Sequence, residues 1–321
     1  MNGKKIFSLI KKMGGMRVLT QLAMSRILFF SISITCFLGF NRKSLEIARL
    51  AINNRRLQKL RKWNKKFIAN YLAHNSSNRE RKHSSKVWFL WLQGVDQAPY
   101  LVKKCYESLK NNLRDRDIVV LTEANYRNYV SFPDYIQRKI DAGVITKTHF
   151  SDLLRLELLE RYGGTWIDAT VYCSGADYPD YMFDSDLFIY QCLMPGQNGS
   201  CIPFSSWFIS STTNHPIISL TKALLYNYWK KRNSMIDYFL IHYFLQLSIE
   251  TYPDEWKKVV PFCNSLPHML LLRLFDTYDK RTWDAIKQQT CFHKLTYKFD
   301  AKSESLCGTY YEQILKNNEV K

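Results

Sequence analysis

The order of strand, helix and strand in the middle of the chain constrains the fold most. Residues 87–94 (VWFLWLQG) form an apolar, aromatic-rich run that ends in glycine, typical of a buried strand followed by a loop. Pro99 then opens a helical pattern, and a second apolar run, DIVVLT, follows at 117–122. Because short links join these elements, the order predicts a parallel sheet with crossover helices, an α/β fold.

The stretch SDLLRLELLERYGGTWIDATVYCSG, residues 151–175, predicts a helix, a glycine turn and a strand. On the helix, Asp152 and Arg155 fall inside an arc of leucines and are three residues apart, so they can pair. A buried charge costs several kcal/mol unless it is matched, so this pair either satisfies itself or faces a polar ligand. Asp168 lies in the predicted strand TWIDATVYC, and carboxylates at strand ends hold metals that bridge phosphates. The sequence has no GxGxxG or GxxxxGK[ST] motif to bind phosphate instead.

The net charge of +18 is confined to the N-terminal part of the chain. Up to Lys86 there are 20 Lys and Arg against two acids, whereas residues 87–321 hold 26 of each sign. Residues 44–72 predict a basic amphipathic helix, which suits an anionic membrane surface. Two alternatives to membrane binding remain: the charged face packs on the body of the protein, or it binds a polyanion. No nucleic-acid-binding module accompanies the charge, so nucleic acid is not an expected partner.

Residues 27–40 are uncharged, but 14 residues are short for a bilayer core of about 30 Å. Extending the run back to residue 18 includes Arg26, so a single span at 18–40 is possible but costly. The polar, turn-rich stretch 74–86 predicts a linker. We therefore expect a basic helical extension with its linker at 1–85 and a catalytic domain at 86–321. Eight scattered cysteines without a CxxC pair predict reduced thiols on the cytosolic side.

Three segments resemble the capsular-polysaccharide-synthesis branch of the bacterial DXD-sugar-binding glycosyltransferases. They are LWLQG with the following AP at 90–99, SDLLRLELLERYGGTWIDAT at 151–170 and FHKLTYK at 292–298. More distantly, the same core looks like the glycosyltransferase domain of large clostridial toxins. The resemblance runs from about Lys86 to Lys298 and leaves the basic segment outside it. It implies a GT-A fold, with a Rossmann-like, mostly parallel sheet, and sugar transfer with retention from a nucleoside-diphosphate sugar.

The resemblance also implies roles for individual residues. Trp91 would stack on the nucleobase, with Gln93 and Gly94 under the nucleoside. Asp152 and Arg155 would hold ribose or sugar hydroxyls, and Asp168, the first DXD carboxylate, would hold Mn²⁺ or Mg²⁺ against the diphosphate. The remaining donor-side candidates are Gly163, Gly164, Thr170, His293, Lys294 and Lys298. Candidates on the acceptor side are Ser206, Trp207, Asp237 and His242.

Two of these candidates carry open alternatives. Thr170 stands where the motif usually has a second aspartate, which weakens metal binding. Either the substrate diphosphate holds the cation or another ligand compensates, and metal dependence is in doubt. His293, Lys294 and Lys298 are the candidates for that compensation, because they could neutralise the leaving phosphates. A histidine beside a phenylalanine, however, is also typical of a packing residue.

The resulting hypothesis is a membrane-associated glycosyltransferase of the hexosyltransferase type. It would transfer a sugar, with UDP-hexose as the expected donor, to a capsular polysaccharide or its lipid-linked precursor at the cytoplasmic face of the membrane. One alternative is a non-catalytic membrane- or polyanion-binding protein on a degenerate glycosyltransferase fold. Another is sugar-phosphate transfer, which would release a nucleoside monophosphate. The donor, the acceptor, the linkage and the oligomeric state do not follow from the sequence.

Overall fold

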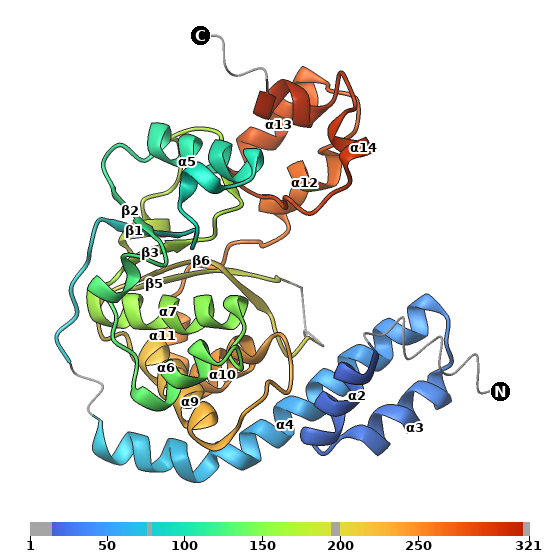
Figure 1. Cartoon of the computed structure of the whole chain (residues 1–321), viewed down its shortest axis with the longest axis vertical. Coiled ribbons are helices and arrows are strands. Elements are labelled where there is room, and N and C mark those ends of the chain that lie inside the picture. The colour runs from blue at the N-terminus through green and yellow to red at the C-terminus, as the bar shows by residue number, and fades with distance from the viewer. Residues whose placement is uncertain (1–14, 76–78, 194–199, 317–321) are drawn as a thin grey trace.

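The computed structural model describes residues 15–75, 79–193 and 200–316. Residues 1–14 of the predicted basic extension, residues 76–78 of the predicted linker, and residues 194–199 and 317–321 of the predicted catalytic domain lie outside these ranges. Figure 1 shows a central sheet with helices on both faces, a C-terminal group of short helices above it and the N-terminal helices to one side.

The central sheet has five strands in the order β2-β1-β3-β6-β5. β1 pairs in parallel with β2 and with β3, whereas β6 is antiparallel to both β3 and β5. Four strands therefore share one direction and β6 runs against them, which confirms the predicted mixed, mostly parallel sheet. The strands are β1 (Lys86–Leu90), β2 (Asp117–Leu121), β3 (Gly164–Ile167), β5 (Leu187–Gln191) and β6 (Phe204–Ser211).

Two hydrophobic clusters cover the two faces of this sheet, because successive side chains of a strand point to opposite faces. Trp88 and Trp166 belong to the cluster packed under α7, α9 and α10, whereas Val87 and Ile167 belong to the cluster facing α5 and α8. The helices are α5 (Tyr100–Asn112), α6 (Asp134–Asp141), α7 (Lys147–Tyr162), α8 (Tyr181–Asp184), α9 (Pro216–Lys231), α10 (Leu240–Thr251) and α11 (Pro253–Lys257). Short turns of 3-10 helix occur at η1 (Val95–Gln97) and η2 (Tyr126–Asn128).

The C-terminal helices form a third cluster, which includes Leu101 and Cys105 of α5. This part of the chain returns to the main body through a strand that pairs with the segment after β3. Its elements are η3 (Leu266–His268), α12 (Met269–Arg273), α13 (Lys280–Gln289), β7 (Phe292–Lys294), α14 (Ala301–Glu304) and the π-helical η4 (Tyr311–Lys316).

The predicted single strand TWIDATVYC is two strands separated by a turn. β3 ends at Ile167, residues 168–170 turn, and β4 (Val171–Cys173) then pairs antiparallel with β7 in a separate two-stranded sheet. Asp168 is therefore not inside a strand, as the apolar pattern had suggested, but directly after the end of one. This places its carboxylate at the edge of the main sheet where β1 and β3 also end.

The N-terminal segment is helical, as predicted, but not one continuous span. α2 (Gly15–Met24) and α3 (Leu28–Leu38) are separated by a tight turn in which Arg26 has a φ of +57°. The possible helix across 18–40 is thus interrupted at its charged residue. Within the described parts of the chain, no helix has both the length and the apolar character needed to cross a membrane.

The predicted basic helix is α4 (Arg42–His74), and its second half packs on the body. Leu57 and Leu60 are buried in the same cluster as α9 and α10. Arg56 is also buried and pairs with Asp237 at 2.7 Å, so this cation serves packing and not a membrane surface. The first half of α4 instead contacts α3, away from the sheet (Figure 1).

Candidate active site

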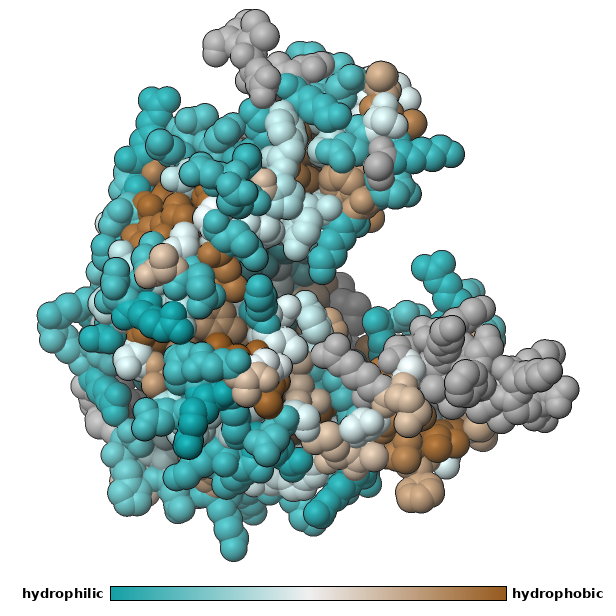
Figure 2. Space-filling model, viewed as in Figure 1, coloured by the Kyte–Doolittle hydropathy of each residue, from teal (hydrophilic) through white to brown (hydrophobic). Residues whose placement is uncertain are grey.

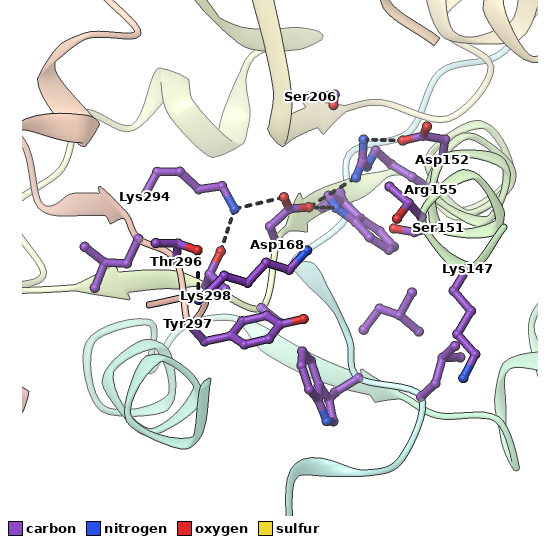
Figure 3. A pocket seen from close by; sticks show the side chains of 18 of the residues that line it. Lys147, Ser151, Asp152, Arg155, Asp168, Ser206, Lys294, Thr296, Tyr297 and Lys298 are labelled. Atoms are coloured by element: carbon purple, nitrogen blue, oxygen red, sulfur yellow. Dashed lines mark hydrogen bonds and ion pairs between the residues drawn. The ribbon is translucent and has the colours of Figure 1, made fainter. Parts of the chain in front are cut away.

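A cavity of about 540 Å³ lies where β1 and β3 end. Ligand sites of α/β sheets form outside the carboxyl ends of parallel strands, and the volume suits a nucleotide-sized molecule. Figure 3 shows side chains from α7, the turn after β3, β6 and the segment after β7 converging on it. The charged residues that line it are Lys147, Asp152, Arg155, Asp168, Lys294 and Lys298.

Asp152, Arg155 and Asp168 converge in this cavity, as predicted. The turn at Gly163 sends β3 back along α7, and the eight helical residues before it span about 12 Å. The strand covers about 13 Å over the residues leading to Asp168, so Arg155 and Asp168 come level with each other. Arg155 Nη1 is 3.2 Å from Asp152 Oδ1, and its Nη2 is 3.1 Å from Asp168 Oδ1. The buried charges in the leucine arc thus satisfy one another while facing a cavity.

The carboxylate of Asp168 is held by three groups from three parts of the chain, the first of which is Arg155. Its Oδ1 also accepts a hydrogen bond from Trp166 Nε1 at 2.9 Å, and its Oδ2 is 3.1 Å from Lys294 Nζ. Burial raises the pKa of this carboxyl, but the positive charges of Lys294 and Arg155 outweigh that effect and lower the pKa below its usual range. Asp168 is therefore ionised at neutral pH and held in a fixed position.

Lys294 and His293 lie on opposite faces of β7, because neighbours in a strand alternate. Lys294 points to Asp168, and Lys298 reaches into the cavity from the same segment (Figure 3). His293 is fully buried, bonds Ser174 Oγ at 2.9 Å and packs on Trp283. Burial lowers the pKa of His293 to about 3. His293 is therefore a packing residue, and it does not line the cavity.

Of the three residues predicted to bind the nucleoside, two line the cavity and one does not. Trp91 and Gln93 line the cavity, and Tyr297 stands edge-on to Trp91 with ring centroids 5.6 Å apart. The indole Nε1 of Trp91 is buried without a hydrogen-bond partner. Such an orphaned donor beside a cavity fits a ligand with acceptor atoms. Gly94 does not line the cavity, and its φ of +82° serves the turn into η1 instead.

Gly163 and Gly164 were predicted on the donor side, and this is wrong. They stand at the start of β3, at the opposite end from Asp168, and do not line the cavity. The carbonyl oxygen of Gly163 accepts a hydrogen bond from Trp88 Nε1 at 2.9 Å. Both glycines have a positive φ, and a Cβ would lie 3.0 Å from Ser211 O at Gly163 and 2.3 Å from Lys86 O at Gly164, so the backbone conformation and packing against neighbouring strands explain them.

Only half of the acceptor-side candidates reach the cavity. Ser206 and His242 line it, whereas Trp207 points to the other face of β6 and donates to Asn264 Oδ1 at 3.0 Å. Asp237 precedes α10, forms an ion pair with Arg56 and does not line the cavity. Burial lowers the pKa of His242 to about 4, although the nearby carboxylates of the site act against it, so this ring is neutral at pH 7.

Several lining residues were missed in the sequence. Lys147 and Ser151 precede Arg155 by two turns and one turn of α7, so they share its face. This spacing of four residues along the helix could have identified both of them from the sequence. Tyr238 also lines the cavity, whereas the prediction had named its neighbour Asp237 instead. Thr170 does line the cavity, as predicted.

The side chains around Asp168 do not form the oxygen-rich set that Mg²⁺ or Mn²⁺ requires. Among the described residues there is no group of three or more His, Cys, Asp or Glu that could hold a metal ion. Beside Asp168 stand the neutral hydroxyl of Thr170 and the ammonium of Lys294, which is 2.5 Å from Thr170 Oγ1. A divalent cation at this point would be repelled by that ammonium and would find one carboxylate ligand.

Comparison with protein families decides where the chain belongs. Residues 40–314 match the family described as capsular polysaccharide synthesis protein. The chain belongs to the capsular polysaccharide synthesis protein family. The resemblance stated from the three motifs is thereby confirmed. The match is longer than those motifs, because it starts at residue 40 and takes in α4, which the motif resemblance had left outside.

The comparison with solved structures includes a "PaToxG Glycosyltransferase" at 15% sequence identity, with a TM-score of 0.36. It covers 81% of this chain and 97% of that one. The comparison with curated proteins gave no match. For this member of the capsular polysaccharide synthesis protein family, the chemistry of the site therefore has to be argued from its own cavity.

Proposed function

We propose that this capsular polysaccharide synthesis protein is a retaining glycosyltransferase of the GT-A type. It would transfer a hexose from a nucleoside-diphosphate sugar, such as a UDP-hexose, to a capsular polysaccharide or its lipid-linked precursor. The observation that carries the proposal is the cavity itself. It holds two carboxylates, four cationic side chains and an orphaned indole donor at the carboxyl edge of the sheet.

The charge of the cavity suits a diphosphate. Its lining has two more cationic side chains than carboxylates; of these cations Lys294 pairs with Asp168, and Lys298 lines the same cavity. Trp91 and Tyr297, which also line the cavity, offer an aromatic wall for a nucleobase. The hydroxyls of the sugar would bond the ion-paired Asp152 and Arg155, because these groups keep unused donors and acceptors, including the unpartnered Arg155 Nε.

Retention is proposed by a front-face route. The bond from the anomeric carbon to the phosphate oxygen breaks, and the electron pair leaves with the phosphate. The acceptor hydroxyl forms the new bond on the same face and passes its proton to that departing oxygen. No residue is assigned as nucleophile, because Asp152 and Asp168 are both tied to Arg155. The cations of the cavity stabilise charge as it develops on the leaving group.

The N-terminal helices support a location at the membrane surface. α3 carries no charged residue, and Phe29 and Phe37 are each 85% exposed. Figure 2 shows apolar side chains gathered at this end of the molecule. Arg42 and Lys43 follow directly at the exposed start of α4. An apolar face bordered by cations suits the interface of an anionic bilayer, where a lipid-linked acceptor would be held.

Product analysis tests the proposal. The protein would be incubated with a panel of radiolabelled UDP- and GDP-sugars and with lipid-linked oligosaccharide. We expect a nucleoside diphosphate and a retained glycoside as products. Asp168→Asn and Arg155→Met should reduce transfer at least 100-fold, whereas Asp284→Asn, an acid on α13 outside the cavity, should not.

Each alternative has its own outcome in this experiment. Release of a nucleoside monophosphate would identify sugar-phosphate transfer. Failure of every donor to turn over or to raise the melting temperature would identify a non-catalytic membrane- or polyanion-binding protein. Normal transfer by Asp168→Asn would contradict the role given to this carboxylate.

A further inference from the structure

Lys294 occupies the position at which the DXD motif is expected to hold a metal. The pairing of β4 with β7 sets Val171 opposite Lys294, directly after the turn that carries Asp168 and Thr170. Lys294 Nζ is 3.1 Å from Asp168 Oδ2 and 2.5 Å from Thr170 Oγ1. Two residues at the motif spacing thus bind the same ammonium (Figure 3).

The other groups around Asp168 leave little room for a second cation. Asp168 Oδ1 already accepts from Arg155 Nη2 at 3.1 Å and from Trp166 Nε1 at 2.9 Å. The Lys294 side chain is only 19% exposed, so its amine cannot move freely into solvent. Introducing a divalent ion here would bring it close to two cationic side chains within a partly buried site, which is electrostatically unfavourable.

We propose that the ammonium of Lys294 takes the place of the divalent cation and that donor binding by this protein is independent of metal. Asp168 and Thr170 orient the ammonium toward the diphosphate, and Lys298 from the same segment supplies a second positive charge. This role of Lys294 explains why a threonine, Thr170, stands where the motif usually has a second aspartate. A hydroxyl suffices to orient an ammonium, whereas a second carboxylate is needed only to hold a divalent ion.

In the transfer step, Lys294 is a catalytic residue that contacts the leaving group. The anomeric carbon–oxygen bond breaks, the electron pair stays on the diphosphate, and Lys294 and Lys298 meet the charge that develops there. The proton of the acceptor hydroxyl goes to the departing oxygen, so no proton of Lys294 is consumed. This inference rests on the proposed function, since it assumes a nucleoside-diphosphate donor.

The test compares nucleotide binding with and without metal. UDP and GDP would be titrated into the full chain by calorimetry, once in EDTA and once in Mn²⁺. We expect one of them to bind with affinities that agree within about threefold in the two buffers. Lys294→Met should weaken that binding at least tenfold in EDTA, and Lys294→Arg, which keeps the charge, should recover part of it. Lys280→Met, at an 80% exposed lysine on α13, is the matched control.

The outcomes separate this inference from the proposed function. Binding seen only with Mn²⁺, together with sugar transfer that needs Mn²⁺, would overturn the role of Lys294 and leave the glycosyltransferase intact. Unchanged affinity in Lys294→Met, with circular dichroism and melting temperature like those of the parent, would also overturn it. Absence of nucleotide binding and of transfer in both buffers would overturn both proposals.

Discussion

Gly164 shows at the scale of one residue why a sequence position can look functional and be structural. Its φ is +87°, and a Cβ added there would lie 2.3 Å from the carbonyl oxygen of Lys86 in the neighbouring strand. The carbonyl oxygen and the Cα that would carry the Cβ both belong to the backbone of paired strands, β1 and β3, so they cannot simply move apart. A glycine beside a binding motif is therefore required here by packing between strands, and the motif alone could not reveal which role it has.

Gly164→Ala should lower the free energy of unfolding by about 2–5 kcal/mol, from the contact and the strained φ together. The control is Gly143→Ala, where φ is +68° but no atom lies within 4 Å of the added Cβ. It should cost only about 1–2 kcal/mol, the strain of the left-handed conformation. Urea unfolding measures both variants. Equal losses would show that the contact with Lys86 is not limiting.

At the scale of elements, periodicity predicted the helices and the sheet well. Leu101, Val102, Cys105 and Leu109 are all buried on α5, and β1 and β2 pair in parallel as their apolar patterns indicated. The site was harder, because it depends on strand register. Whether His293 or Lys294 faces Asp168 is decided by the pairing of β7 with β4, and no local pattern specifies it. Similarly, the ion pair of Arg56 with Asp237 joins segments that are far apart in sequence.

α3 gives the prediction that belongs to an element. Phe29→Asp combined with Phe37→Asp should reduce binding to vesicles of phosphatidylcholine and phosphatidylglycerol at least tenfold, because the exposed rings would no longer enter the interface. Co-sedimentation measures it, and binding should also weaken as salt rises. Leu272→Asp, at a 79% exposed leucine of α12, is the control. Equal vesicle binding by the parent and the double variant would rule out this face, and a loss of self-association instead would assign it to a second copy of the chain.

At the scale of the whole molecule, buried histidines link stability to pH. Burial lowers the pKa of His215 and of His242 to about 4, and that of His293 to about 3. In the unfolded chain these rings titrate near 6.5. Between these values the unfolded chain binds protons that the folded protein does not bind, so the stability present at pH 7 is lost as the pH falls.

We expect the free energy of unfolding to fall between pH 6.5 and pH 4.5 by up to about 1.4 kcal/mol per pH unit for each of these histidines. His293→Gln should reduce this slope by one histidine's share, and the same substitution at the exposed His74 should leave it unchanged. Urea titrations at several pH values measure the slope. A stability that does not change over this range would contradict the assignment of neutral, buried rings.

The pairing of β4 with β7 has a consequence for the order in which the protein matures. A nascent chain that has emerged through Ser211 already contains every strand of the central sheet, yet it lacks the strand that brings Lys294 to Asp168. Until that late segment leaves the ribosome, the carboxylate faces an unfinished cavity. The complete cavity should therefore form only after β7 has emerged, later than the sheet that supports it.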